Sequence, residues 1–223
     1  MGHFITLTAA DGHQFSAWRA APKHRPARAG LVLVQEIFGV NAHIRSVAEA
    51  FAAKDFAVIA PALFDRVRRD TELGYEAKDI AEGRELRGRL NWEDPLRDIE
   101  AARRQIAAET AKVGVVGYCW GGSLSFLSAC RLGFDAAVCY YGAQIADFAE
   151  EKPNCPVMMH FGERDSSIPA EARDRIRKAQ PDAEIHLYDA GHGFNCDMRT
   201  DYHPQSAELA MERTLNFFER YLR

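Results

Sequence analysis

Gly117-Tyr118-Cys119-Trp120-Gly121-Gly122 joins an apolar stretch, Lys112–Gly117, to a run of small and apolar residues, Gly122–Arg131. The first stretch is typical of a buried strand and the second of a helix. Glycines two positions before and after Cys119 suit a sharp strand-to-helix turn, because larger side chains there would collide with the adjacent strand or helix. The sequence therefore predicts that Cys119 lies at a helix N-terminus, where the dipole and N–H groups favour a thiolate.

This strand–turn–helix context is the one required of a G-x-S-x-G nucleophile elbow, with Cys119 in the serine position. A thiolate is a strong nucleophile, so the turn predicts covalent catalysis. The alternative is a structural cysteine in a glycine-rich turn. Cys130 and Cys139 fall in helix and strand patterns and are expected to be small apolar fillers. The five cysteines include no Cys-x-x-Cys pair, which favours reduced thiols and a cytoplasmic location over a disulfide framework or a zinc site.

Strands and helices alternate along the chain, which predicts an α/β-hydrolase fold with a mostly parallel central sheet and helices on both faces. A single domain is expected over residues 1–223. Apolar runs predict the other buried strands over Leu31–Gln35, Phe56–Ala60 and Val157–Phe161, and further strands are expected over Asp135–Tyr141 and Glu184–Tyr188. Helical spacing predicts a helix capped by Asn41 and further helices over Pro95–Ala108, Pro169–Ala179 and Pro204–Leu222.

Three further segments are interpreted from their composition. Phe4–Thr8 and Gln14–Trp18 are expected to form a hairpin. Ala21–Gly30 resembles an exposed connection, and the charged stretch from Leu63 to about Asn91 predicts a loop and an exposed helix, with Tyr75 among possible rim residues.

Bulk properties restrict the partner to a small molecule. The 223 residues are 47% apolar and 27% charged, which allows a full core, and the formal charge of −4 provides no basic surface for nucleic acid or an anionic membrane. The N-terminus lacks the pattern of a signal peptide, and no apolar stretch reaches the roughly 18 residues of a membrane span. Oligomeric state is left open, between a monomer and a small homo-oligomer.

An acid and a base follow Cys119 in the chain order typical of α/β-hydrolases. Asp165 comes directly after a predicted strand, and Glu163 is its rival on spacing. His192 follows the next strand between two glycines, which would allow its ring to turn back over the sheet edge. The other histidines are expected to be structural or solvated; they are His3, His13, His24, His43, His160, His186 and His203.

Glu36 follows the first buried strand, where an unpaired buried carboxylate would be costly. One interpretation is a loop carboxylate that lies in water or caps the next helix. The other places Glu36 beside the thiol, where its charge disfavours the thiolate until substrate arrives. The backbone N–H groups of Ile37 and Trp120 could then form an oxyanion hole.

Four motifs together resemble the dienelactone hydrolase family (carboxymethylenebutenolidases), in the same order over nearly the whole chain. They are Gln35-Glu36-Ile37-Phe38-Gly39-Val40-Asn41, Gly117-Tyr118-Cys119-Trp120-Gly121-Gly122, Tyr140-Tyr141-Gly142 and Gly191-His192-Gly193-Phe194.

The resemblance implies hydrolysis of a cyclic enol ester in bacterial breakdown of aromatic compounds, with no metal or organic cofactor. It implies Cys119 as nucleophile, His192 as base and Asp165 as its orienting acid. It also implies that Glu36 contacts the resting thiol and that Ile37 and Trp120 supply oxyanion donors. The residues expected to contact substrate are Phe38, Tyr141, Phe194, Arg84 and Arg199.

One position departs from the family pattern. Dienelactone hydrolases bind the substrate carboxylate with arginines, one of them shortly after the catalytic histidine, and here Cys196 stands at that place. Arg199, Arg84 and Arg87 are candidates to replace it. Two other functions use the same residues: a carboxylesterase or thioesterase for another small ester, and a non-hydrolytic protein that senses redox state through a thiol or binds a ligand.

Overall fold

The computed structural model describes residues 2–223. By its internal contacts the chain divides into two compact units, one ending at Gly114 and one spanning Val115–Arg223. The expectation of a single domain over residues 1–223 stays a prediction. In the described part of the chain, no helix combines the length and the apolar character that a membrane span needs.

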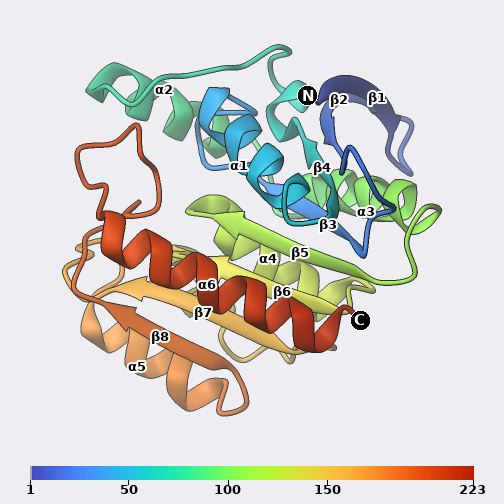
Figure 1. The fold of residues 1–223 in the computed structure, drawn as a ribbon. Coiled ribbons are helices and arrows are strands. Elements are labelled where there is room, and N and C mark those ends of the chain that lie inside the picture. The colour runs from blue at the N-terminus through green and yellow to red at the C-terminus, as the bar shows by residue number, and fades with distance from the viewer. Residues whose placement is uncertain (1) are drawn as a thin grey trace. The chain divides into compact units, whose positions relative to one another are not determined.

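Four strands form the sheet of the first unit in the order β1-β2-β4-β3. Strands β1/β2 and β2/β4 pair antiparallel, while β3/β4 pair parallel. Helices α1 and α3 pack on opposite faces of these strands (Figure 1). The bounds are β1 His3–Thr8, β2 Gln14–Ala20, β3 Ala29–Val34, β4 Phe56–Pro61, α1 Ala42–Ala52, α2 Ala77–Gly88, α3 Glu93–Ala107 and the 3₁₀ helix η1 Leu63–Arg66.

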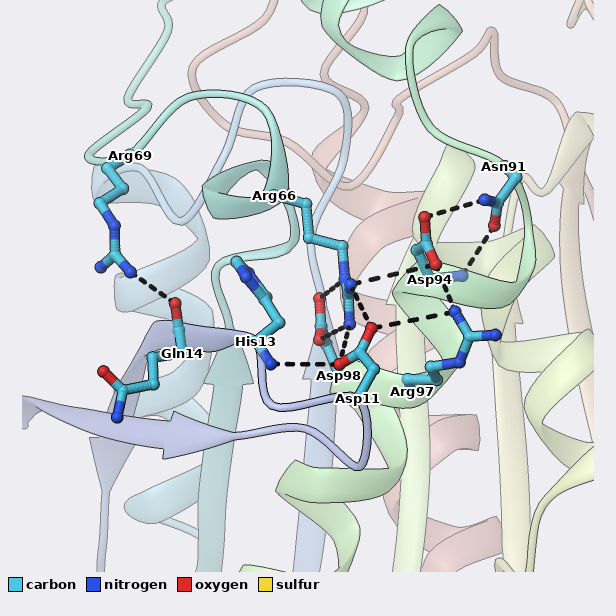
Figure 2. Close-up of polar contacts among 9 residues, drawn as sticks. All are labelled: Asp11, His13, Gln14, Arg66, Arg69, Asn91, Asp94, Arg97 and Asp98. Carbon is cyan, nitrogen blue, oxygen red and sulfur yellow. Dashed lines mark hydrogen bonds and ion pairs between the residues drawn. The ribbon is translucent and has the colours of Figure 1, made fainter.

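The side chain of Arg66 connects three segments of the first unit (Figure 2). Arg66 of η1 makes two hydrogen bonds to Asp98 of α3, at 2.8 and 2.7 Å. Its Nη1 group and the shared Nη2 group donate to Asp11, in the turn between β1 and β2, at 2.8 and 3.3 Å. The arginine side chain is only 10% exposed and that of Asp98 is fully buried, so each charge has its compensation inside the protein.

The second unit carries strands β5, β6, β7 and β8 in that order, with β6/β7 and β7/β8 parallel. Helix α6 crosses one face of these strands, and α4 and α5 lie on the other (Figure 1). Every residue of β5, β6 and β7 is buried, which explains their apolar sequences. The bounds are β5 Val113–Tyr118, α4 Trp120–Arg131, β6 Ala136–Tyr140, η2 Ala143–Phe148, β7 Val157–Gly162, α5 Ala170–Ala179, β8 Glu184–Tyr188 and α6 Pro204–Tyr221.

The α/β class, the parallel pairing and the helices on both faces are confirmed. The predicted ends of most strands differ from the observed ends by one or two residues, including both ends of β3. Ala29 and Gly30 belong to buried β3 and not to an exposed connection. A Cβ on Gly30 would lie 2.7 Å from Thr110 Oγ1, so glycine permits this close approach. Gln35 falls outside β3, and its amide instead accepts a hydrogen bond from the Leu63 N–H at 3.1 Å.

Candidate active site

Cys119 occupies a strained turn between β5 and α4. Its backbone has φ +56° and ψ −119°, a conformation that is costly for any residue with a side chain. The Cys119 N–H donates to the Tyr140 carbonyl at 3.0 Å. A Cβ on Gly117 would lie 2.1 Å from the Gly121 oxygen, and one on Gly122 would lie 2.4 Å from the Tyr140 oxygen. Close backbone approach therefore requires glycine at Gly117, as the sequence predicts, and also at Gly122.

The second unit brings the three residues of the predicted triad together. His192 Nε2 lies 3.2 Å from Cys119 Sγ, and His192 Nδ1 lies 2.7 Å from Asp165 Oδ2. The other carboxylate oxygen of Asp165 accepts the Ser167 N–H at 2.8 Å. The side chain of Asp165 is fully buried and that of His192 is 18% exposed. This is the nucleophile–base–orienter arrangement of acyl-transfer sites.

The charges around His192 favour its protonated form. Burial lowers the pKa of the imidazole, but the negative charge of Cys119 and the hydrogen bond to Asp165 outweigh that effect. The net result is a pKa of His192 above its ordinary value of 6.5. An imidazolium beside the sulfur stabilises a thiolate, which is the reactive form of cysteine.

The loop that carries His192 is shaped by two glycines. A Cβ on Gly162 at the end of β7 would lie 2.3 Å from the Ala190 carbonyl, so this glycine lets the loop approach the strand. Gly193 has φ +77°, which favours glycine, and a Cβ there would lie 2.6 Å from Arg199 Nη1. The Arg199 guanidinium therefore packs beside the catalytic loop, with its side chain 14% exposed.

The aromatic side chain of Tyr141 packs against the imidazole, and Phe194 packs against Tyr141 in turn. The Tyr141 ring lies 5.2 Å from the His192 ring, centroid to centroid, at an interplanar angle of 61°. Phe194 is fully buried and packs against Tyr141, Tyr188 and Tyr140. Trp120 is the first residue of α4, so its N–H lies at the N-terminus of that helix.

Glu36, Ile37 and Phe38 belong to the first unit. Glu36 is fully buried and its carboxylate accepts a hydrogen bond from the Tyr75 hydroxyl at 3.4 Å, which excludes a carboxylate that lies in water. The Asn41 side chain, and not Glu36, caps α1 by accepting the Ile44 N–H at 3.2 Å. The roles of Glu36 toward the thiol and of the Ile37 N–H toward an oxyanion stay predictions.

The other candidates in the first unit lie on or beside α2. Phe38 is buried against Tyr75, with ring centroids 4.6 Å apart. Arg84 is exposed. The Arg87 guanidinium stacks over the Trp92 ring at 4.5 Å, and burial lowers the pKa of Arg87. Their contacts with substrate stay predictions.

Comparison with known proteins identifies the family of this chain. Residues 15–222 match the model of the dienelactone hydrolase family. The chain belongs to the dienelactone hydrolase family. A carboxymethylenebutenolidase of Pseudomonas putida is 34% identical over 223 residues, which cover 96% of this chain and 94% of that protein. Family and relatives together make the chain a carboxylic ester hydrolase.

Solved structures agree with this assignment. A candidate dienelactone hydrolase from Klebsiella pneumoniae superposes with a TM-score of 0.86 at 30% identity, covering 98% of this chain and all of that one. An esterase from Pyrococcus furiosus superposes with a TM-score of 0.74 at 12% identity, over 100% of this chain and 93% of that one, and shows the shared fold alone. This dienelactone hydrolase family member therefore has an α/β-hydrolase fold.

The alternative acid Glu163 and two other cysteines of this family member differ in environment from the residues of the candidate triad. Glu163 is exposed, whereas Asp165 is 2% exposed and bonded to His192. Burial raises the pKa of Cys130 to about 12 and that of fully buried Cys139 well above 9.0, as expected of apolar fillers.

Two contributors to the site were not predicted from the sequence. The Ser167 N–H holds Asp165, and the backbone of Tyr141 adopts a left-handed conformation with φ +37°. The only signal for the second was Gly142, which marks a chain bend without saying which residue carries the positive φ.

Proposed function

We propose that this protein hydrolyses a small lactone or enol ester through Cys119, His192 and Asp165. The supporting observation is the continuous chain of contacts from sulfur to imidazole to carboxylate, with separations of 3.2 and 2.7 Å. Cys119 would attack the substrate carbonyl as a thiolate. Asp165 would hold the imidazole in the orientation that places Nε2 toward the sulfur.

In the first half of the cycle, a C–S bond forms and the ester C–O bond breaks. The backbone N–H of Trp120 would stabilise the oxyanion, and the family resemblance adds the Ile37 N–H as a second donor. The raised pKa of His192 supports an imidazolium that gives its proton to the departing oxygen. An enolate leaves readily, so a lactone of this kind suits the site.

In the second half, neutral His192 takes a proton from water as that water attacks the thioester. The thiolate of Cys119 departs, the carboxylic acid product is released, and one water molecule has been consumed. The thiolate and the imidazolium that entered the first half of the cycle are restored. The exchange of Glu36 away from the thiol, implied by the family, would precede the first step.

The test compares dienelactone with p-nitrophenyl acetate as substrates for wild type and variants. We expect selective turnover of dienelactone, and a fall in kcat of at least about 10³-fold in Cys119→Ala and in His192→Ala. Cys130→Ala removes a half-buried thiol outside the triad and should keep wild-type rates. Activity on simple esters alone would replace the lactone by the carboxylesterase alternative. Undiminished ester cleavage in His192→Ala would reject the triad.

A further inference from the structure

Tyr141 combines a strained backbone with a contact to the catalytic histidine. Its φ of +37° is in the left-handed region, where a bulky residue is a real outlier and costs about 1–3 kcal/mol. Glycine or asparagine would occupy this conformation more cheaply. A tyrosine here therefore has to be justified by what its side chain does.

The surrounding structure imposes this conformation. The Tyr141 N–H donates to the His160 carbonyl at 2.8 Å, which fixes the chain at the end of β6. The next residue, Gly142, runs so close to α4 that a Cβ on it would lie 2.7 Å from the Ser123 N–H nitrogen. The chain has to bend sharply between these two contacts, and the bend falls on Tyr141.

The bend turns the Tyr141 side chain toward the imidazole. The tyrosine is fully buried, and its ring contacts His192 at 5.2 Å and Phe194 at 5.3 Å between centroids. Phe194 supports the tyrosine ring at an interplanar angle of 72°. Packing on both sides leaves the phenol ring little freedom to move.

The two hydrogen bonds of His192 only weakly restrict one rotation of its ring. Both bonds lie near the plane of the imidazole and point in roughly opposite directions, toward Asp165 and toward Cys119. They fix where the ring nitrogens are, but they resist rotation of the ring about the line between its two partners only weakly. A rigid aromatic ring packed against the imidazole blocks that rotation.

We propose that Tyr141 is a positioning residue that fixes the plane of the His192 ring. This inference rests on the proposed Cys119–His192–Asp165 function. Through it, the lone pair or proton at Nε2 stays aimed at the sulfur and at the attacking water. A misplacement of a catalytic group by about 1 Å can cost about 10²-fold in rate. The role differs from a pocket contact, because it acts on the base and not on substrate.

The experiment measures kcat and KM separately for wild type, Tyr141→Phe and Tyr141→Leu on an ester that the wild type turns over. Phenylalanine keeps the ring, so we expect kcat within about threefold of wild type. Leucine removes the ring, so we expect kcat to fall about 10- to 100-fold with KM within about twofold. Phe217→Leu, a buried aromatic of α6 in the same unit, controls for lost packing and should keep kcat.

A pocket role predicts the opposite pattern, with KM raised and kcat kept in Tyr141→Leu, and that result would overturn the proposal. So would an equal loss of kcat in Phe217→Leu at a matched fall in Tm. If Tyr141→Leu does not fold, Tyr141→Met, whose unbranched and flexible side chain adapts to irregular packing, gives the same comparison. Cys119→Ala separates the two levels: full activity in that variant rejects the proposed function itself, whereas an inactive Cys119→Ala with normal kcat in Tyr141→Leu rejects only the positioning role.

Discussion

The charged groups of the candidate site act mainly on His192. The sulfur of Cys119 and the carboxylate of Asp165 lie at its two nitrogens, and both favour the charged ring against the effect of burial. The imidazole can therefore hold a proton at neutral pH, where a solvated histidine is mostly neutral.

Removing the sulfur should lower the pKa of His192. In Cys119→Ala the largest favourable charge beside the ring is gone, while burial and Asp165 remain. NMR titration of the imidazole carbon-bound protons in wild type and Cys119→Ala should show the fall directly. Cys130→Ala should leave the titration unchanged, and an identical curve for Cys119→Ala would contradict the ion pair.

Among single residues, the sequence predicted those that chain order and spacing determine. Cys119, Asp165 and His192 were identified because each follows a predicted strand in the required order. The contacts of Tyr141 and Ser167 were not identifiable. A left-handed backbone at a tyrosine, or an N–H that finds a carboxylate two residues earlier, has no composition signal of its own.

Among the elements, η1 shows that a charged stretch of sequence can include buried residues. The segment after Leu63 was interpreted as loop and exposed helix, yet Leu63 and Phe64 are buried and Arg66 bridges η1 to α3. Helix α2, in the same stretch, was predicted correctly. A short 3₁₀ turn has no periodicity to detect, so its burial is set by tertiary contacts alone.

Asp98→Ala should destabilise the first unit substantially. The change leaves Arg66, with a 10% exposed side chain, hydrogen-bonded to Asp11 and without its two hydrogen bonds to Asp98, and the loss of hydrogen bonds from a buried partner costs roughly 1–3 kcal/mol. Urea denaturation of wild type and variant measures the loss. Arg97→Ala is the matched control, because that side chain is 45% exposed in the same cluster (Figure 2) and should cost about 1 kcal/mol or less. Equal losses in the two variants would contradict this account.

Over the whole chain, the fold class was easier to predict than the residues at which strands begin and end. Continuous apolar runs identified the central strands β3 to β7, because these strands are buried on both faces of the sheet, and helical spacing identified the longer helices. The residues at which strands begin and end depended on single contacts, such as the close approach of Gly30 in β3 to Thr110. Substrate identity depends on side chains from several loops, which no motif of this chain records.

The contribution of His160 to the stability of the whole protein should fall as the solution is acidified below pH 6.5. Burial lowers the pKa of His160 well below 6.5, and both ring nitrogens are engaged, with Tyr188 at 2.8 Å and Thr214 at 3.0 Å. The unfolded chain therefore binds a proton that the folded protein excludes. The stabilisation is fully present above the unfolded pKa and is lost as the pH falls toward the folded value, at about 1.4 kcal/mol per pH unit for each proton.

His192 acts with the opposite sign, since its folded pKa is raised: its contribution is full below pH 6.5 and is lost only as the pH rises from there. Asp98 opposes the slope of unfolding free energy between pH 6.5 and 5, because burial raises its folded pKa to about 7, so the contribution of His160 is measured as the difference in slope between wild type and a His160 variant. His160→Gln should lower that slope, because the group that takes up the proton is gone. Thr214→Val removes a hydrogen bond to the same ring and should lower stability by about 1 kcal/mol, yet it keeps the histidine and hence the slope. A His160→Gln protein with the wild-type slope would assign the acid sensitivity to other groups.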